Sequence, residues 1–551
     1  MPNHLRAPTR HGELVLAPAG SWAELVRANE AQLAQGELWG RPLATIREEA
    51  RAEVYTRATR STRDLIEPES FAVRSATGRS AAEQQTTLRS PHWVIGGHQP
   101  ELFHPGVWVK NGVVAGLATR LGGVGLNLIV DNDLCAGAAV RVPSGPDLPG
   151  ITSLDWDVPR PQTPWEERQL PDAEMFTSFG ERCREHLRPW GIEPLAASQD
   201  WGAFPERGVV DRLASLRMGF ERSVGVRNLE LKVSDLADTH CFRRFLIGAW
   251  CDAEALRAAY NSALTDYRSL YRIRSRSHPV PALEATTEGV ETPFWVWRAG
   301  EAQRRRLFVQ ATGPERLRLH DGRREIGTIA ATSEATALTQ LHDLRGQGWK
   351  IRPRALTLTL FCRMCLGSVF VHGIGGAKYD EMTDALMQRW LGLTPPAIIV
   401  ATATMQLFEG FAGPPLEPEI ARLQQALRSI RWNPESVLQA AASASVVARS
   451  AKERPVADRT TTLQAEKSAL LVSSLDPATR HLRLQAINSA LRAPLAEHEQ
   501  LVRHALQQHL TALPHQRFLR SREFSANLFP AEAMQTLFQQ AMERVSSVGE
   551  P

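Results

Sequence analysis

The sequence predicts an α/β protein with a Rossmann-like, mostly parallel sheet at its core. Two segments of similar layout, residues 92–134 and 351–400, each read as buried strand, polar or glycine-rich turn, helix and buried strand. Right-handed crossovers join parallel strands in nearly all known folds, so two such units build one parallel sheet economically. A tail with helical periodicity follows from about residue 413.

The first unit starts with the apolar strand Trp93–Ile95. Apolar residues then recur with helical spacing over residues 107–121, and the glycines at 122–123 end that pattern. Leu126–Val130 predicts the second strand, which an acidic turn at 131–133 follows. Ligands of such sheets bind beyond the carboxyl ends of the strands, so both turns belong to a candidate site.

The candidate residues of this unit are polar or glycine residues at those turns and at the start of the helix. They are Gly97, His98, Gln99, His104, Lys110, Asp131 and Asp133. Backbone N–H groups at the helix start, with Lys110 reaching back, suit an anion, although a solvated helix lysine is the alternative. The two aspartates are expected on one side of the strand end. They suit a ribose, an amine, Mg²⁺ or a general base, or they only form the turn.

His98 and His104, with Glu101 between them, have the residue types of a metal site. Their spacing matches no established metal signature, so contacts to a ligand phosphate or carboxylate are favoured and no metal is expected. A loop held by its own hydrogen bonds is the alternative.

In the second unit, residues 373–378 predict a glycine-rich loop that cradles a phosphate or an adenosine. Its candidate contacts are Gly373, Gly375, Gly376, Lys378 and Tyr379. Asp380 is expected either to contact the ligand or to cap the following helix. Arg352, beside a proline, suits bidentate binding of a carboxylate or phosphate, or a surface ion pair. Cys362 and Cys365 lack any second pair and are expected to be buried thiols.

The rest of the chain divides by pattern. The expected parts are residues 1–90 (N-terminal helical segment, ending in an irregular polar stretch at 66–91), 91–139 (first half of the core), 140–335 (α+β insertion), 336–412 (second half of the core) and 413–551 (C-terminal helical coiled coil). Ser21 predicts a helix N-cap and Asp321-Gly322 a β-hairpin. Apolar residues spaced 4, 3, 4 and 3 from Leu416 to Ile430 predict a heptad seam and a homodimer through the helical part.

Composition excludes several classes of protein. The net charge of +4 over 551 residues argues against a nucleic-acid binder, and no apolar run is long enough to span a membrane. Six scattered cysteines and an N-terminus without a continuous apolar stretch favour a cytoplasmic protein. A small-molecule substrate is the expected partner.

Short motifs resemble those of the cysteine-adding enzymes of bacillithiol biosynthesis, the bacillithiol synthase or cysteine ligase family. Its first strand ends in Gly-Gln-Gln before a Gly-Pro turn, which Gly97–Pro100 and Phe103–Gly106 match in part. The acidic turn at 131–133 stands where that family has a Glu-Asp-His-Asp-like turn. The family's Arg-Pro and Gly-Pro-Gly-Glu-x-x-Tyr motifs correspond to 352–353 and 373–379. Gly376 replaces the glutamate of that last motif, and His98 replaces a glutamine.

The resemblance implies a core related to nucleotidylyl-transferase folds and a coiled-coil arm. It also implies a ligase that joins an amino acid, with cysteine as the first candidate, to an amino sugar or similar amine. The cofactor stays open, with ATP or ADP as candidates. In this reading His98, Gln99 and residues 373–378 hold the phosphate or adenosine side, and Lys110, Lys378 and Arg352 stabilise negative charge. Asp131 or Asp133 orients or deprotonates the amine. The alternatives are nucleotidyl transfer, against which the missing His-x-Gly-His signature counts, and a non-catalytic ligand-binding or scaffold protein.

Overall fold

The computed structural model describes residues 5–66, 92–146, 150–444 and 454–547, and most of the stretch expected to be irregular at 66–91 lies outside them. The chain forms two compact units. One comprises Met1–Leu407 and Arg522–Pro551, and the other comprises Phe408–Ser521. Each unit is described by itself.

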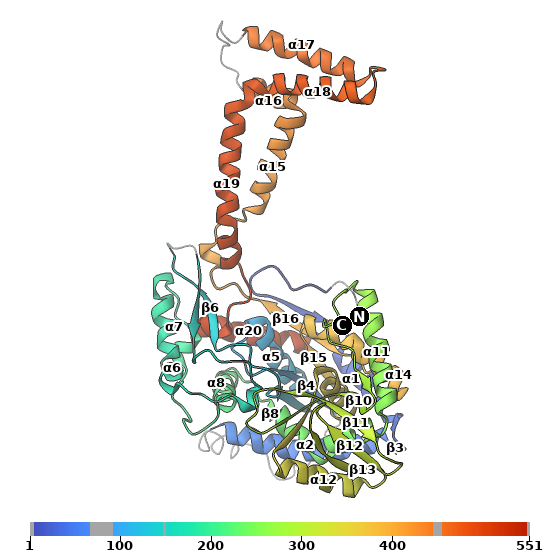
Figure 1. Ribbon diagram of the computed structural model, residues 1–551. Helices are drawn as coiled ribbons and strands as arrows, with labels where there is room; N and C mark the ends of the chain where they lie inside the picture. The colour runs from blue at the N-terminus through green and yellow to red at the C-terminus, as the bar shows by residue number, and fades with distance from the viewer. Residues whose placement is uncertain (1–4, 67–91, 147–149, 445–453, 548–551) are drawn as a thin grey trace. The chain divides into compact units, whose positions relative to one another are not determined.

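The larger unit contains a six-stranded sheet of order β1-β16-β15-β4-β5-β8 (Figure 1). Its strands are β1 (Glu13–Ala17), β4 (Trp93–His98), β5 (Val124–Ile129), β8 (Leu229–Lys232), β15 (Val369–His372) and β16 (Ile399–Thr404). Neighbours from β16 to β8 are parallel, and β1 pairs antiparallel with β16. The α/β class and the parallel pairing of both predicted units are confirmed. The edge strand β1, in a segment expected to be helical, was not predicted.

Helices cover both faces of this sheet. They include α1 (Trp22–Ala34), α2 (Leu43–Leu65), α5 (Pro105–Arg120), α13 (Ala355–Phe361), α14 (Ile374–Leu391) and α20 (Ala531–Ser547). Ser21 caps α1 as predicted, because its side chain accepts a hydrogen bond from the backbone N–H of Glu24. A π-helical turn, η4 (Cys362–Leu366), follows α13. It holds both cysteines of the Cys-x-x-Cys pair, which are buried as expected.

Alternation along β4 decides which helices cover each face. Gly96 faces α5, where a Cβ atom would lie 3.0 Å from the Val114 side chain. Trp93 and Ile95 point the other way, into a core cluster that also contains Leu386 of α14. The helix that follows β4 and the helix that follows β15 therefore lie on opposite faces of the sheet.

A second, antiparallel sheet has the order β13-β12-β11-β10-β14, with β9 beside β10. Its strands are β9 (Ala285–Thr286), β10 (Gly289–Arg298), β11 (Arg305–Ala311), β12 (Arg316–His320), β13 (Glu325–Ala330) and β14 (Trp349–Pro353). The hairpin predicted around Asp321-Gly322 is confirmed by β12 and β13. Two short ribbons pair β2 (Glu37–Leu38) with β3 (Arg41–Pro42) and β6 (Ala139–Pro143) with β7 (Ile151–Asp155).

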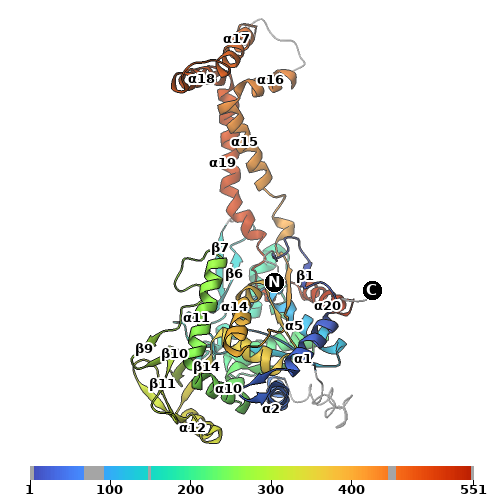
Figure 2. The same cartoon turned by 90° about the vertical axis from the view of Figure 1, so that its right-hand side faces the viewer.

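The helices of the insertion are α6 (Ala173–Thr177), α7 (Phe179–Leu187), α8 (Val209–Ser223), α9 (Val233–Ala237), α10 (His240–Cys251), α11 (Ala253–Leu270) and α12 (Glu334–Gly346). Short 3-10 turns are η1 (Trp165–Glu167), η2 (Arg188–Trp190) and η3 (Leu195–Ser198). The segment is α+β as expected, but it interleaves with the core. Strand β8 pairs with β5 in the parallel sheet, and β14 pairs with β10 in the antiparallel one. Figure 2 shows α11 beside α14, so the insertion also covers part of the core.

The smaller unit is helical. Its elements are η5 (Glu409–Phe411), α15 (Glu417–Trp432), α16 (Pro434–Ala444), α17 (Arg454–Leu471), α18 (Pro477–Arg492), η6 (Ala493–Leu495) and α19 (Ala496–Leu519). Helices α15 and α19 lie side by side (Figures 1 and 2), and Ile420, Leu423 and Ile430 of the predicted seam are buried. After η7 (Ala526–Leu528), α20 packs on α5 of the larger unit. The helical periodicity of residues 413–551 did not predict that α20 belongs to the larger unit.

Candidate functional site

The carboxyl ends of the parallel strands lie along one edge of the sheet and carry polar residues. His98 ends β4, His372 ends β15, Lys232 ends β8 and Thr404 ends β16. Asp131 follows β5 by two positions. Ligands of parallel sheets bind at this edge, and most of the residues predicted from the sequence lie on it or beside it.

Between β4 and β15 the chain changes direction across the sheet. Strand β4 leads through α5 to β5, whereas β15 leads through α14 to β16 on the other side. Ile95 pairs with Phe370, and continuing this register places Gly373 beside His98. The first turns of α5 and α14 therefore flank one point of the edge, where open α/β sheets form a crevice.

Lys110 lies in the second turn of α5 and is only 7% exposed. Among the residues that the structure describes, its ammonium group has no hydrogen bond and no ion pair. Burial lowers the pKa of Lys110 to about 8. Burial, and the nearby charge of Lys110, lower the pKa of His98 to about 3, so that His98 is neutral. The alternative of a solvated helix lysine is wrong.

His104 is the N-cap of α5. Its Nδ1 accepts a hydrogen bond from the backbone N–H of Gly106 at 3.1 Å, and its Nε2 lies 3.6 Å from the carboxylate of Glu523. A side chain at Gly106 would overlap the carbonyl oxygen of Ala403, so α5 approaches β16 as closely as the backbone allows. His104 is thus held by the fold. Gly97, one position before His98, is also confined, since a Cβ atom there would lie 2.8 Å from the Leu128 carbonyl oxygen.

Asp133 forms one wall of the site with residues of the insertion. Its carboxylate accepts a hydrogen bond from Gln99 Nε2 at 2.8 Å and lies 3.1 Å from Arg304 Nη1. The guanidinium carbons of Arg304 and Arg354 lie 4.8 and 4.1 Å from the ring centroid of Trp295. The Asp133 side chain is 40% exposed, so it stays accessible to a ligand.

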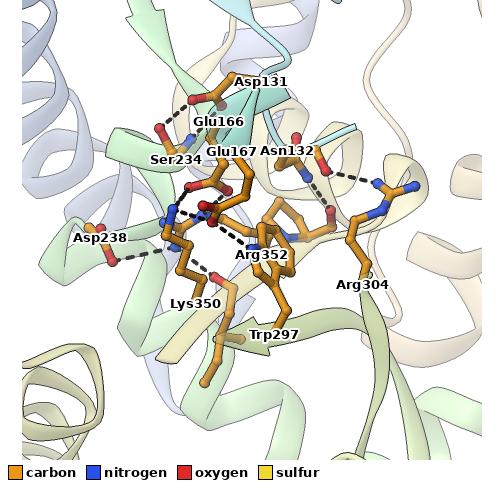
Figure 3. Close-up of polar contacts among 12 residues, drawn as sticks. Asp131, Asn132, Glu166, Glu167, Ser234, Asp238, Trp297, Arg304, Lys350 and Arg352 are labelled. Carbon is orange, nitrogen blue, oxygen red and sulfur yellow. Dashed lines mark hydrogen bonds and ion pairs between the residues drawn. The ribbon is translucent and has the colours of Figure 1, made fainter. Parts of the chain in front are cut away.

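Asp131 takes a different role from Asp133, contrary to the expectation that both face one side. It is 1% exposed and accepts hydrogen bonds from Ser234 N at 2.9 Å and Ser234 Oγ at 2.5 Å (Figure 3). Strand β5 ends at Ile129, so strand alternation no longer applies at these positions. Burial and the nearby Glu166 carboxylate raise the pKa of Asp131 to about 7.

Arg352 forms a buried ion pair. Its Nε and Nη2 lie 3.0 and 3.1 Å from the two carboxylate oxygens of Glu166, and Nη1 lies 3.6 Å from Asp238 (Figure 3). Lys350 adds contacts of 3.1 Å to Glu166 and 2.5 Å to Glu167. Against the effect of burial, Glu166 and Asp238 raise the pKa of Arg352. The ion pair is internal rather than at the surface, and Arg352 is not available to bind a ligand.

Residues 374–378 are the first turn of α14 rather than a loop, because the helix begins at Ile374 with Gly373 as its N-cap. Gly375, Gly376 and Lys378 are exposed on that turn. Tyr379 is half-buried, close enough to Arg354 and Asp133 for both to influence its pKa. Asp380 is not the cap. It lies in the second turn of α14, where it is buried and its carboxylate is 2.6 Å from Arg363 Nη1.

His372 is a site residue that the sequence patterns did not single out. It is 8% exposed, its Nε2 lies 3.1 Å from Asp380 Oδ2, and its ring stacks on Phe370. A histidine at the last position of a buried strand, followed by an aspartate in the next helix, was the available signal.

A polar cavity of about 500 Å³ opens beside the ends of β5 and β8. Its lining includes Asp131, Asp211, Lys232 and Ser234, with Lys232 paired to Asp211 at 3.1 Å. The volume is within the range of small-molecule sites.

Other kinds of site find less support. In the described parts of the chain no three His, Cys, Asp or Glu side chains are grouped so as to hold a metal ion. Within the same residues, no helix combines the length and the apolar character needed to cross a membrane. Burial raises the pKa of the Cys365 thiol to about 12, which makes it a poor nucleophile.

Comparison with models of protein families gives no match, and neither does comparison with curated protein sequences.

Proposed function

We propose that the larger unit has a Rossmann-like core that binds a phosphate-bearing small molecule, with ATP or ADP as the first candidates, where β4 and β15 end. We further propose that the protein is a ligase resembling the cysteine-adding enzymes. It would join an amino acid, cysteine first, to an amino sugar or a similar small amine. The observation that carries the proposal is Lys110, a buried ammonium group without a counter-ion among the described residues, beside the point where the chain reverses across the sheet.

A buried, unpaired cation costs stability, and such groups are retained where they bind a ligand or stabilise charge in a reaction. Lys110 lies on the helix that starts at the crevice, and its charge acts on His98. An anionic ligand there would supply the missing counter-ion. In the proposed reaction Lys110 stabilises the negative charge that develops on the activated carboxyl group.

Asp133 is the better candidate of the two aspartates for contact with the incoming amine. Its carboxylate is partly exposed and oriented by Gln99 and Arg304, whereas Asp131 is enclosed by Ser234. The polar cavity beside β5 and β8, which Asp131 lines, offers room for a sugar-sized amine. We assign Asp131 a positioning role, in which it fixes α9 to the end of β5.

A thermal-shift series tests ligand binding, with ATP, ADP, cysteine and an amino-sugar malate as probes. Wild type is expected to be stabilised by at least one nucleotide, and Lys110→Met is expected to lose that response. Arg316→Met, which removes an exposed cation of β12, is the matched control. No shift with any probe would contradict the proposal and favour a scaffold protein. A nucleotide shift without cysteine-dependent turnover would favour nucleotidyl transfer.

We also propose that the smaller unit is a coiled-coil arm that pairs two copies of the chain. Large apolar side chains are exposed on this unit, among them Leu482 at 65% and Leu501 at 64% on its helices and Val472 at 87% directly after α17. Pairing of two copies would cover such side chains. Light scattering is expected to give twice the chain mass, and a Leu482→Gln/Leu501→Gln variant is expected to give one. A monomeric wild type would contradict the pairing.

A further inference from the structure

His372 is held in one orientation by a network of buried charges. Its Nε2 lies 3.1 Å from Asp380, and that carboxylate lies 2.6 Å from Arg363. Arg363 in turn lies 2.7 Å from Asp384. The Phe370 ring, with its centroid 4.4 Å away, fixes the plane of the imidazole. Since Asp380 accepts at Nε2, the Nδ1 atom is the one left for a ligand.

Nδ1 faces the first turn of α14. A Cβ atom at Gly376 would lie 3.0 Å from it, so the absence of a side chain at 376 keeps this approach open. Of the described residues, none forms a hydrogen bond with Nδ1. The helix has no side-chain cap and no acidic residue in its first turn, and it is 18 residues long. The backbone N–H groups of that turn and the positive end of the helix dipole therefore meet an imidazole that is nine-tenths buried.

We propose that the first turn of α14 and Nδ1 of His372 form a binding site for a tetrahedral oxyanion, the phosphate group of a nucleotide or of a phosphorylated sugar. N–H groups at 374–376 donate to the anion, as at other helix N-termini. The imidazolium form of His372 donates through Nδ1, with Asp380 as its counter-ion. The inference rests on the proposed function only in placing the ligand at this edge of the sheet.

Charged groups surround the ring. Asp380 and Asp384 come from α14 and Arg363 from η4. His98 on the neighbouring strand contributes no charge, because burial and Lys110 lower its pKa to about 3. The groups that would face an anion here are therefore Nδ1 of His372 and the backbone N–H groups of the turn.

Sulfate is the probe, because it is tetrahedral and doubly charged. Calorimetric titration of the full chain with sodium sulfate at pH 6 is expected to show binding by wild type about 5-fold tighter than binding by His372→Gln. Parallel titrations with ATP and with glucosamine 6-phosphate identify which source of phosphate the site prefers.

The glycines of the turn supply a matched pair of variants. Gly376→Ala places a methyl group against Nδ1 and is expected to weaken sulfate binding several-fold at pH 6. Gly375→Ala, one position earlier, meets nothing within 4 Å and is expected to bind as wild type does. Both changes add the same helix propensity, so stability does not separate them.

Equal binding by the two alanine variants would overturn the inference, as would a wild type that does not bind sulfate at pH 6. If His372→Gln fails to fold, the glycine pair still decides the question. The measurement needs no turnover. Sulfate binding in a protein without ligase activity would contradict the proposed function and leave this inference standing.

Discussion

Along one stretch of the sheet edge the charged side chains pair with one another, and along another stretch a charged side chain has no partner within the part of the chain that the structure describes. Where β5 ends, the carboxylates and cations pair with one another, as Glu166 does with Arg352 and Lys350. Where β4 and β15 end, Lys110 has no counter-ion among the described residues, and nothing among them bonds Nδ1 of His372. Arg352, Lys110 and His372 are all buried, so solvent does not explain the difference.

The difference shows which charges serve the fold and which are left for a ligand. Figure 3 shows the paired stretch joining elements of both sheets, since Arg352 lies on β14, Glu166 on η1 and Asp131 at the end of β5. Removing one partner there leaves an uncompensated buried charge. Removing Lys110 instead eliminates an uncompensated buried charge. For the two cations, the sign of the change in stability therefore separates the paired Arg352 from the unpaired Lys110.

The largest effect is expected for Arg352→Met. It leaves Glu166 buried with Lys350 as its remaining cationic partner, and the free energy of unfolding is expected to fall by about 3–5 kcal/mol. Urea unfolding at pH 7.5 measures the change. Arg316→Met, at an exposed position of β12, is the control and is expected to stay within about 0.5 kcal/mol of wild type. Equal effects of both variants would remove the structural role of Arg352.

Asp131→Asn is expected to change stability in a pH-dependent way. The carboxyl group has a pKa of about 7 in the fold against 3.8 unperturbed, so the folded state keeps a proton that the unfolded state loses. This costs stability progressively from pH 4 to pH 7 and fully above pH 7. The variant removes that cost but also the charge-assisted bonds from Ser234, for a net gain of ~2 kcal/mol at pH 8 and little at pH 4. Urea midpoints across that range test it, and a gain independent of pH would contradict the shifted pKa.

Elements with strong local signals were predictable from the sequence. Strand β4, helix α5 and strand β5 follow from apolar periodicity, and Ser21 identified the start of α1. Strand β8 was missed because four residues carry too little periodicity to distinguish a strand from its helical surroundings.

Within the site, the sequence predicted which residues lie at the strand ends, but it did not predict which charged side chains pair with one another. His98, Gln99 and Asp133 do converge, because parallel strands bring their carboxyl ends together. Arg352 resembled a ligand-binding arginine, since nothing local shows that Glu166, 186 residues away in the chain, would neutralise it. The residues at 373–378 resembled a loop because three glycines disfavour a helix, yet packing of α14 overrides that propensity.

Lys110→Met is expected to act in the opposite direction to Arg352→Met and more weakly. Burial of the ammonium destabilises the fold at any pH below about 8, where Lys110 is charged in both states. This destabilisation decreases between pH 8 and 10.5, because Lys110 loses its proton at a lower pH in the folded state than in the unfolded state. The variant is expected to gain ~1–2 kcal/mol at pH 7 and almost nothing at pH 10.5. A loss of stability at pH 7 would show that Lys110 belongs with the paired charges.

The smallest change in stability is expected for Asp133→Asn. The carboxylate is 40% exposed, and its contacts with Arg304 and Gln99 lie near the surface, so the free energy of unfolding should fall by less than about 1 kcal/mol. Asparagine keeps an oxygen for Arg304 but cannot take a proton from an amine. Under the proposed function, turnover of cysteine with an amino sugar is therefore expected to disappear while ATP still raises the melting temperature. Asp64→Asn, at an exposed carboxylate of α2, is the comparison variant and should retain turnover. Unchanged turnover in Asp133→Asn would place the proton acceptor elsewhere on the edge, and His372, with Nδ1 open toward α14, would be the next residue to substitute.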